Sequence, residues 1–190
     1  MIDTNWRPPT LETDRLRLRP LTDEDAEAVF AYASNANVTR YTVFDAHRTI
    51  DDARTFVGPM AQGHYLERVP EPLGIVLKAE ATLVGSLGCH WASQPNHCME
   101  LGYAIGEPWW NRGIATEAAR ALLAHTFATY EVERIQAHHM AGNEASGRVM
   151  RKLGMTHEGI HRSARLHRGT FVDIYSYAVL RKDWMSRAVS

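Results

Sequence analysis

The chain has 190 residues, of which 45% are hydrophobic, and it carries 21 Lys plus Arg against 22 Asp plus Glu. This length predicts one domain with a substantial core, and the formal net charge of -1 excludes a global attraction to nucleic acid or to an anionic membrane. No apolar run approaches the roughly 18 residues that a spanning helix needs, and the N-terminus lacks a basic region followed by an apolar core. We therefore expect a cytoplasmic protein without nucleic-acid or membrane partners, in which residues 1–10 form a loose arm and residues 11–184 form the domain.

The N-terminal part of the domain combines a strand with two helices. Residues 16–19 alternate apolar and charged side chains, which predicts a strand, and Thr22 followed by Asp25 is typical of the start of a helix. A second short helix is predicted over residues 50–60, where Gly58 and Pro59 mark its end.

The middle of the chain favours an antiparallel meander. Three strand-like runs cover residues 73–78, 82–90 and 98–105. From Gly113 the apolar residues follow the spacing of an amphipathic helix, at positions 115, 118, 119, 122, 123 and 127. Residues 132–139 then predict another strand.

The C-terminal part contains one helix and two strands. Asn143 suits a helix N-cap and Gly154 suits the left-handed residue that ends a helix. Residues 155–159 and 170–180 have strand-like patterns. The predicted fold class is thus α/β, with a mixed sheet that is antiparallel at the front and contains a parallel pair later.

The two cysteines lie in a symmetrical arrangement around a turn. Cys89-His90 and His97-Cys98 mirror each other, so a hairpin would place them opposite each other as a two-Cys, two-His metal site. Adjacent strand residues point to opposite faces, however, and one hairpin cannot easily aim all four inward. We favour ordinary strand residues and expect no metal.

The most informative segment joins the third strand of the meander to the next helix. Arg112 and Gly113 lie in the loop directly before that helix. Free N–H groups at a helix N-terminus, with the helix dipole, suit an anion such as a pyrophosphate. The spacing differs from the P-loop and from the Rossmann fingerprint, and the alternative is that Gly113 only makes a tight turn.

The run from Trp110 to Ala118, WNRGIATEA, resembles the acetyl-CoA pyrophosphate loop of the GNAT acetyltransferase superfamily, Q/R-x-x-G-x-G/A. Trp110 takes the place of the first Gln or Arg, as in the branch of RimJ/RimL-type ribosomal-protein N-acetyltransferases. Further segments similar to that branch are LETDRLRLRPL at residues 11–21, ELGY at 100–103, the helix at 143–155 and GTFVDIYSYA at 169–178. The resemblance implies a GNAT fold with a central sheet of about seven strands and about four flanking helices.

The resemblance also implies which residues bind acetyl-CoA as co-substrate. The pantetheine arm would lie along Tyr103, Ala104 and Ile105, and Asn143 would contact it. The pyrophosphate would be held by Arg112, Gly113, Ile114, Ala115 and Thr116. Ser146 matches the serine near the thiol, where its hydroxyl can donate a hydrogen bond to the departing thiolate. The alternative for Ser146 is an ordinary serine in the first turn of a helix.

The proton acceptor departs from the branch. RimL-like enzymes carry a glutamate where this chain has Arg165, which is not a base at neutral pH. Glu100, on the strand that leads to the thioester, is the substitute candidate, acting through water. Its alternative is a surface carboxylate.

A basic cluster surrounds Arg165. It consists of His157, His161, Arg162, Arg165, His167 and Arg168. These residues could bind an acidic peptide or the 3′-phosphate of the cofactor, and the favoured alternative is a solvated loop. Similarly, Trp109 and Trp110 could line the acyl site or simply pack the helix against the sheet.

The expected function is direct transfer of acetyl from acetyl-CoA to a protein N-terminal α-amine. An α-amine has a pKa of about 7.7–8.0 and a lysine amine about 10.4, so a weak base suits the former. The alternatives are a small-molecule amine as acceptor, or a non-catalytic acyl-CoA-binding module. Either a monomer or a homodimer is compatible with the sequence.

Overall fold

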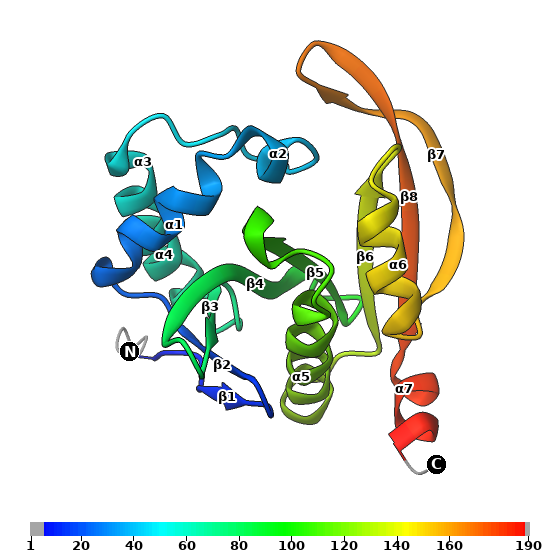
Figure 1. Cartoon of the computed structure of the whole chain (residues 1–190). Helices are drawn as coiled ribbons and strands as arrows, with labels where there is room; N and C mark the ends of the chain where they lie inside the picture. Colours follow the sequence, from blue (N-terminus) through cyan, green and yellow to red (C-terminus); the bar gives the residue numbers. More distant parts are fainter. Residues whose placement is uncertain (1–5, 189–190) are drawn as a thin grey trace. The chain divides into compact units, whose positions relative to one another are not determined.

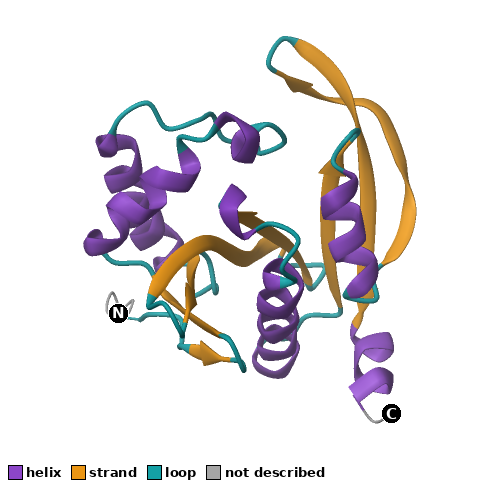
Figure 2. Ribbon diagram, in the orientation of Figure 1, coloured by secondary structure: helices purple, strands orange, loops and turns teal. Residues whose placement is uncertain are grey.

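The computed structural model describes residues 6–188, with only the backbone at the last two of these. Within that range the chain forms two compact units (Figures 1 and 2). The first comprises residues up to 90 together with 102–122, and the second comprises residues 91–101 together with those from 123 onward. Of the expected N-terminal arm, residues 1–5 lie outside the described range. Residues 6–10 form neither helix nor strand, although Pro8 is buried.

The strands of the first unit form an antiparallel ladder. They are β1 (Leu11–Glu12), β2 (Leu16–Pro20), β3 (Leu73–Leu77) and most of β4 (Thr82–Ser93), together with the C-terminal half of β5 (Cys98–Ile105). Neighbours β1 to β4 pair antiparallel in sequence order, and a bulge interrupts the β3–β4 register between Ile75 and Val76. The predicted strand at 16–19 and the antiparallel pairing of the first two strands of the predicted meander are therefore confirmed, and its third strand, β5, is the next hydrogen-bonded neighbour of β4.

Short helices complete the first unit. They are η1 (Asp23–Asp25), α1 (Ala26–Ala33), α2 (Ala36–Thr39), α3 (Ile50–Thr55), η2 (Phe56–Met60), α4 (Ala61–Leu66) and η3 (Glu107–Trp109). The predicted start at Thr22 is confirmed, because the Thr22 amide donates to the Asp25 carboxylate at 2.8 Å. Both oxygens of that buried carboxylate also accept from Arg19 at 2.7 Å. Burial alone would raise the pKa of Asp25, but these hydrogen bonds lower it by more than burial raises it. The net pKa of Asp25 is therefore below its usual range.

The predicted helix end at Gly58 and Pro59 is wrong. The helical path continues from α3 through η2 into α4 and reaches Leu66. Proline lacks the N–H that an α-helix needs, and η2 is a π-type turn in which the hydrogen-bond register is shifted around Pro59. The missing donor is thus accommodated without ending the helix.

The second unit contains the later strands and helices. They are β6 (Arg134–Met140), β7 (Thr156–His167), β8 (Thr170–Leu180), α6 (Glu144–Lys152) and α7 (Arg181–Ala188), with the C-terminal half of α5 (Ile114–Thr129). Strand β6 pairs parallel to the start of β5, and β8 pairs antiparallel with both β6 and β7. Among the described residues, no helix is both long and apolar enough to cross a membrane.

The hydrogen-bonded order of the strands is β1-β2-β3-β4-β5-β6-β8-β7, which makes one mixed eight-stranded sheet. The predicted α/β class and the predicted parallel pair are confirmed. The strand beyond the expected seven is β1, which has only two residues and therefore shows no periodic pattern.

Both predicted ends of α6 are confirmed. The Asn143 side chain accepts from the Ser146 amide at 3.3 Å. Gly154 has φ +80°, and the amide of Met155 donates to the carbonyl of Met150 at 3.1 Å. The amide of Gly154 also donates to the carbonyl of Arg151 at 2.9 Å, and these two bonds at the C-terminus form a Schellman motif, in which a left-handed glycine closes the helix.

Strand β7 is much longer than predicted. It extends to His167 rather than ending near Gly159, and residues 161–166 are all exposed. Because neither face of this segment is buried, the segment lacks the alternation that reveals a strand in a sequence. Its strand conformation comes from hydrogen bonding to β8. The basic cluster therefore lies on a hairpin arm and not on a loop.

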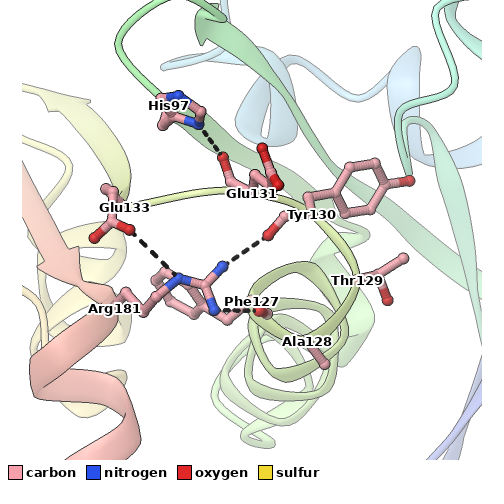
Figure 3. A pocket seen from close by; sticks show the side chains of 8 residues that line it. All are labelled: His97, Phe127, Ala128, Thr129, Tyr130, Glu131, Glu133 and Arg181. Atoms are coloured by element: carbon pink, nitrogen blue, oxygen red, sulfur yellow. Dashed lines mark hydrogen bonds and ion pairs between the residues drawn. The ribbon is translucent and has the colours of Figure 1, made fainter.

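A hollow of about 490 Å³ lies where α5 ends, and Arg181 is its most prominent side chain (Figure 3). The guanidinium donates to the carbonyls of Phe127, Tyr130 and Val132, each at 2.7 Å. A cation at a helix C-terminus satisfies the last carbonyls and opposes the negative end of the dipole. The donors that line this hollow are thus used for structure.

We predict that Arg181→Met lowers the free energy of unfolding by about 2–3 kcal/mol, because three carbonyls lose a charged donor. Urea unfolding followed by circular dichroism measures this change. The matched control is Lys182→Met, whose side chain is exposed and should cost less than about 0.5 kcal/mol. Equal stability of the two variants would contradict a stabilising role for the hydrogen bonds that Arg181 donates to these carbonyls.

Candidate functional site

The loop between β5 and α5, in the first unit, is held to the end of its own strand. Trp110 donates its indole N–H to the carbonyl of Ile105 at 2.6 Å. The ring of Trp109 lies against Gly106, where a Cβ would come within 2.7 Å of it. Trp110 is 40% exposed, so packing the helix against the sheet does not fully account for it. The two tryptophans shape the loop in different ways.

Two left-handed residues then direct the backbone into α5. Asn111 has φ +60° and Gly113 has φ +77°. The first i to i+4 hydrogen bond of the helix runs from the Glu117 amide to the Gly113 carbonyl at 3.0 Å. The three preceding amides, of residues 114–116, therefore have no acceptor within the helix. Residues 111–113 are exposed, so an anion can reach this turn from solvent.

A carboxylate in the first turn of α5 is neutralised by Arg15. Glu117 accepts from the Arg15 Nε at 2.7 Å and from the Thr13 hydroxyl at 2.6 Å. Partial burial raises the pKa of Glu117, but these hydrogen bonds together lower it, so the carboxylate stays ionised. Arg15 also donates to the Arg112 carbonyl at 3.1 Å. One guanidinium thus holds both the loop and the first turn of the helix.

The end of β5, where Tyr103, Ala104 and Ile105 lie, is packed tightly against β4. A Cβ on Gly85 would lie 2.3 Å from the Ala104 carbonyl oxygen. The Gly106 amide also donates to the Val84 carbonyl at 2.8 Å. A glycine at position 85 is therefore required for the backbones to approach this closely.

The loop is also tied to the helical part of the first unit. The carboxylate of Glu107, in η3, accepts from the side-chain amides of Asn35 at 2.7 Å and Asn37 at 2.8 Å. Asn35 is the N-cap of α2. The position of the loop is thus set by long-range contacts through Arg15 and Glu107 and by the local bond of Trp110 to Ile105.

In the second unit, Asn143 and Ser146 come together at the start of α6. Both are half-buried, and the cap bond from the Ser146 amide to Asn143 fixes the turn that carries them. Gly147 follows, with His139 directly beneath it, since a Cβ there would lie 2.8 Å from His139 Nε2. The imidazole of His139 in turn stacks on Tyr175 with ring centroids 4.9 Å apart.

Glu100, also in the second unit, is not an isolated surface carboxylate. It accepts from the Gln136 side-chain amide at 3.0 Å, and its other oxygen lies 3.3 Å from His138 Nδ1. The side chains of Glu100 and His138 are 29% and 27% exposed. The parallel β5–β6 ladder ends at the Glu100–Gln136 pair. Glu100 thus lies where the ladder stops, next to a group that can exchange a proton.

The cysteine and histidine residues around the β4–β5 turn have separate partners. His90 Nδ1 lies 2.6 Å from a Glu71 carboxylate oxygen, and His97 Nδ1 lies 2.6 Å from the Glu131 carbonyl. Cys89 and Cys98 are both buried. Between residues 6 and 188, no three His, Cys, Asp or Glu side chains are arranged as metal ligands.

The predicted site residues are thus grouped within each unit. The loop and the strand end are joined in the first, and Asn143 is joined to Ser146 in the second. Their assignment to the cofactor and to catalysis stays a prediction. Arg15, Gly85 and His138 were missed. Arg15 stands inside the LETDRLRLRPL segment, but its partner is about a hundred residues away in the sequence, and only the folded structure pairs them.

Comparison with known proteins finds relatives of one family. Residues 15–156 match the family described as "Acetyltransferase (GNAT) domain". An uncharacterized N-acetyltransferase, YoaA of Bacillus subtilis, is 35% identical over 91% of this chain and 97% of its own. The crystal structure of a GNAT-family acetyltransferase from Bacillus anthracis is 31% identical, with a TM-score of 0.83, over 92% of this chain and 99% of its own.

A solved structure from the RimL type has the same fold. RimL, described as a ribosomal L7/L12 alpha-N-protein acetyltransferase in complex with coenzyme A, has a TM-score of 0.78 over 90% of this chain and 98% of its own. Its sequence is 19% identical, so this likeness shows the fold alone. The expected GNAT fold is confirmed, and the acceptor is not identified by any of these proteins.

We predict that Gly85→Ala destabilises the protein by about 2–3 kcal/mol, because the new methyl group overlaps a backbone carbonyl that cannot move independently. Chemical denaturation measures the loss. The control is Gly63→Ala in α4, where a Cβ meets nothing within 4 Å and should stabilise by about 0.5 kcal/mol. A neutral effect at Gly85 would show that the β4–β5 contact is looser than described.

Proposed function

Since the chain belongs to the GNAT acetyltransferase family, we propose that it transfers the acetyl group of acetyl-CoA to the N-terminal α-amine of a protein. The observation that carries the choice of acceptor is the β7–β8 arm. Residues 161–166 of this arm are all exposed, which provides an extended surface that a small amine would not use. A polypeptide acceptor fits such a surface. The proposal places the reaction in the cytoplasm, where ribosomal and other nascent proteins are made.

The proposed site for the cofactor diphosphate is the first turn of α5. Its amides at Ile114, Ala115 and Thr116 precede the first helical hydrogen bond, and Gly113 leaves the approach open. Arg112 adds an exposed positive charge. The pantetheine arm is proposed to lie along Tyr103, Ala104 and Ile105, where backbone groups can bind its amides. Asn143 is proposed to contact the same arm.

In the proposed reaction the neutral amine attacks the thioester carbonyl. A C–N bond forms, the C–S bond breaks, and coenzyme A leaves as a thiolate that takes up a proton. The amine must lose one proton, which we assign to Glu100, acting through water and supported by His138 at 3.3 Å. The hydroxyl of Ser146 is assigned as hydrogen-bond donor to the thiolate. No covalent enzyme intermediate is required.

An α-amine requires a weaker base than a lysine amine does, and this fits the proposed proton acceptor. At pH 7 an α-amino group with a pKa of about 7.7–8.0 is about 10–20% neutral, whereas a lysine amine is less than about 0.1% neutral. A half-exposed carboxylate is a weak base. An acceptor that is already partly deprotonated therefore suits Glu100 better than a lysine does.

Two alternatives remain distinguishable by experiment. A small-molecule amine would be acetylated without any contribution from the β7–β8 arm. A non-catalytic acyl-CoA-binding module would bind acetyl-CoA tightly without turnover, and Arg165 in place of a catalytic glutamate is the feature that favours it. The pairing of Glu100 with His138 favours an enzyme, because it provides another proton acceptor.

The deciding experiment measures thiol release from acetyl-CoA with N-terminal peptides, polyamines and amino sugars as acceptors. We expect turnover with peptides, a loss of about 100-fold in kcat for Glu100→Gln, and about tenfold for Ser146→Ala. Glu80→Gln and Ser93→Ala, neither of which is among the proposed site residues, are the controls. Turnover only with small amines moves the assignment to that acceptor class, and binding without turnover makes the protein a module.

A second prediction tests the diphosphate site. Arg15→Met should raise the KM for acetyl-CoA about fivefold, because an uncompensated Glu117 then repels an anion at the helix N-terminus. The activity with S-acetylpantetheine, which lacks the diphosphate, should stay unchanged. The matched control is Arg17→Met, two residues away, which loses an exposed pair with Glu12. A similar loss with both acyl donors would indicate a general structural defect instead.

A further inference from the structure

The tip of the β7–β8 arm, residues 159–172, has an unusual charge for this chain. It contains Arg162, Arg165 and Arg168 and no Asp or Glu, whereas the whole chain has a net charge of -1. We call this segment the basic arm. The two carboxylates that flank it are already used. Glu158 is paired with both terminal nitrogens of Arg134, and Asp173 accepts the Ser163 amide at 2.7 Å.

A bulge is built into the basic arm. His161 pairs with Ile174 and Arg165 pairs with Val172, so three residues of β7 lie opposite Asp173 alone. Ser163, at the centre of this bulge, has φ +49°, and the Asp173 carboxylate holds its amide. The bulge is thus a fixed feature of the hairpin, as bulges near functional sites often are.

The same aspartate connects the bulge to the start of α6. The Asp173 carbonyl accepts from the Ala141 amide at 2.9 Å, and the chain continues from Ala141 directly into Asn143. The basic arm and the turn that carries Ser146 therefore lie at the same end of the second unit. The hollow around Arg181 is at the opposite end, because it contacts the residues before β6.

The register places part of the basic arm on the same sheet face as Glu100. Residues that are directly paired across strands point to the same face, and so do alternate residues along a strand. Glu100 pairs with Gln136, which pairs with Ala178. Two-residue steps along β8 lead from Ala178 to Ser176, Ile174 and Val172, whose partners on the outer strand are Gly159, His161 and Arg165. Arg165 and His161 thus share the face of Glu100.

The distance between Glu100 and Arg165 sets the length of a peptide that could contact both residues. Six residues along β8 span about 20 Å, and three strand spacings from β5 to β7 span about 14 Å, which gives about 25 Å from Glu100 to Arg165. An extended peptide covers about 3.4 Å per residue. Allowing for the length of the side chains, an acceptor whose amine lies at Glu100 would bring its residues at about positions 4 to 7 to the basic arm.

We propose that the basic arm binds acidic side chains at about positions 4 to 7 of the acceptor, so that the enzyme selects proteins with an acidic N-terminal segment. This proposal rests on the proposed function, because it assumes acetylation of an N-terminal amine. The guanidinium groups of Arg162 and Arg165 can supply charge-assisted hydrogen bonds to carboxylates, and the segment itself contains no Asp or Glu. Recognition occurs away from the reacting atoms.

The test uses eight-residue peptides with the same first three residues and either four Glu or four Gln at positions 4 to 7. With the natural enzyme, the KM for the Glu peptide should be about five- to tenfold lower, at similar kcat, and this advantage should shrink as salt is raised from 50 to 300 mM. In Arg162→Ser/Arg165→Ser the two KM values should become equal. The matched control, Arg54→Ser, removes an exposed arginine from α3 and should keep the preference.

Charge reversal provides an independent readout. Arg162→Glu/Arg165→Glu should prefer a peptide with four Lys at positions 4 to 7 over the Glu peptide, which a loss of folding would not produce. A Glu peptide that is favoured equally with its acidic residues at positions 2 and 3 would overturn the proposed span. Unchanged peptide KM values in the serine variants would overturn the proposal itself, whether or not these variants bind RNA or the 3′-phosphate of acetyl-CoA more weakly.

Failure of this inference is distinguishable from failure of the proposed function. If the natural enzyme acetylates both peptides with the same KM, the function stands and the selection of acidic acceptors is wrong. If it acetylates neither peptide but acetylates polyamines, the proposed function is wrong and the basic arm has no peptide to select.

Discussion

The positive end of α5 is available to an anion because the carboxylate in its first turn is neutralised by Arg15. Without this ion pair, Glu117 would place a negative charge next to the very amides that favour negative charge. The same guanidinium holds the Arg112 carbonyl, and Trp110 holds the loop to Ile105. The loop is thus preorganised by contacts from residues that need not touch a ligand, and Gly85 lets the neighbouring strand end pack closely beside it.

Local signals predicted most of the fold. The caps at Thr22, Asn143 and Gly154 work through hydrogen bonds within a few residues, so the sequence contains the whole interaction. The predictions failed in two places. The shifted register around Pro59 lets one helical path continue, and pairing with β8 keeps exposed residues 161–166 extended. Neither effect leaves a periodic pattern in the sequence.

In the candidate site, features within one short segment were predictable, and contacts between distant segments were not. The turn before α5 was predictable because Gly113 and the helix that follows it are contiguous in the sequence, and its role in binding the cofactor stays a prediction. The environment of Glu100 was not predictable, because Gln136 and His138 reach it through the pairing of parallel strands. That environment changes the interpretation of the residue. A carboxylate with a histidine at 3.3 Å is a better candidate for proton transfer than an isolated surface glutamate.

The arginine at position 165 can then be understood through its place in the sheet. Replacing a carboxylate by a guanidinium removes a base and adds a fixed positive charge, so this position cannot serve proton transfer. It stands on the exposed arm, about 25 Å along the sheet from Glu100, a distance suited to contacts with a chain and not to chemistry at its end. Proton transfer and acceptor recognition would thus be separated on one face. The weak demand that an α-amine makes on its base fits this separation, because Glu100 and His138 are the proposed groups for proton transfer and position 165 takes no part in it.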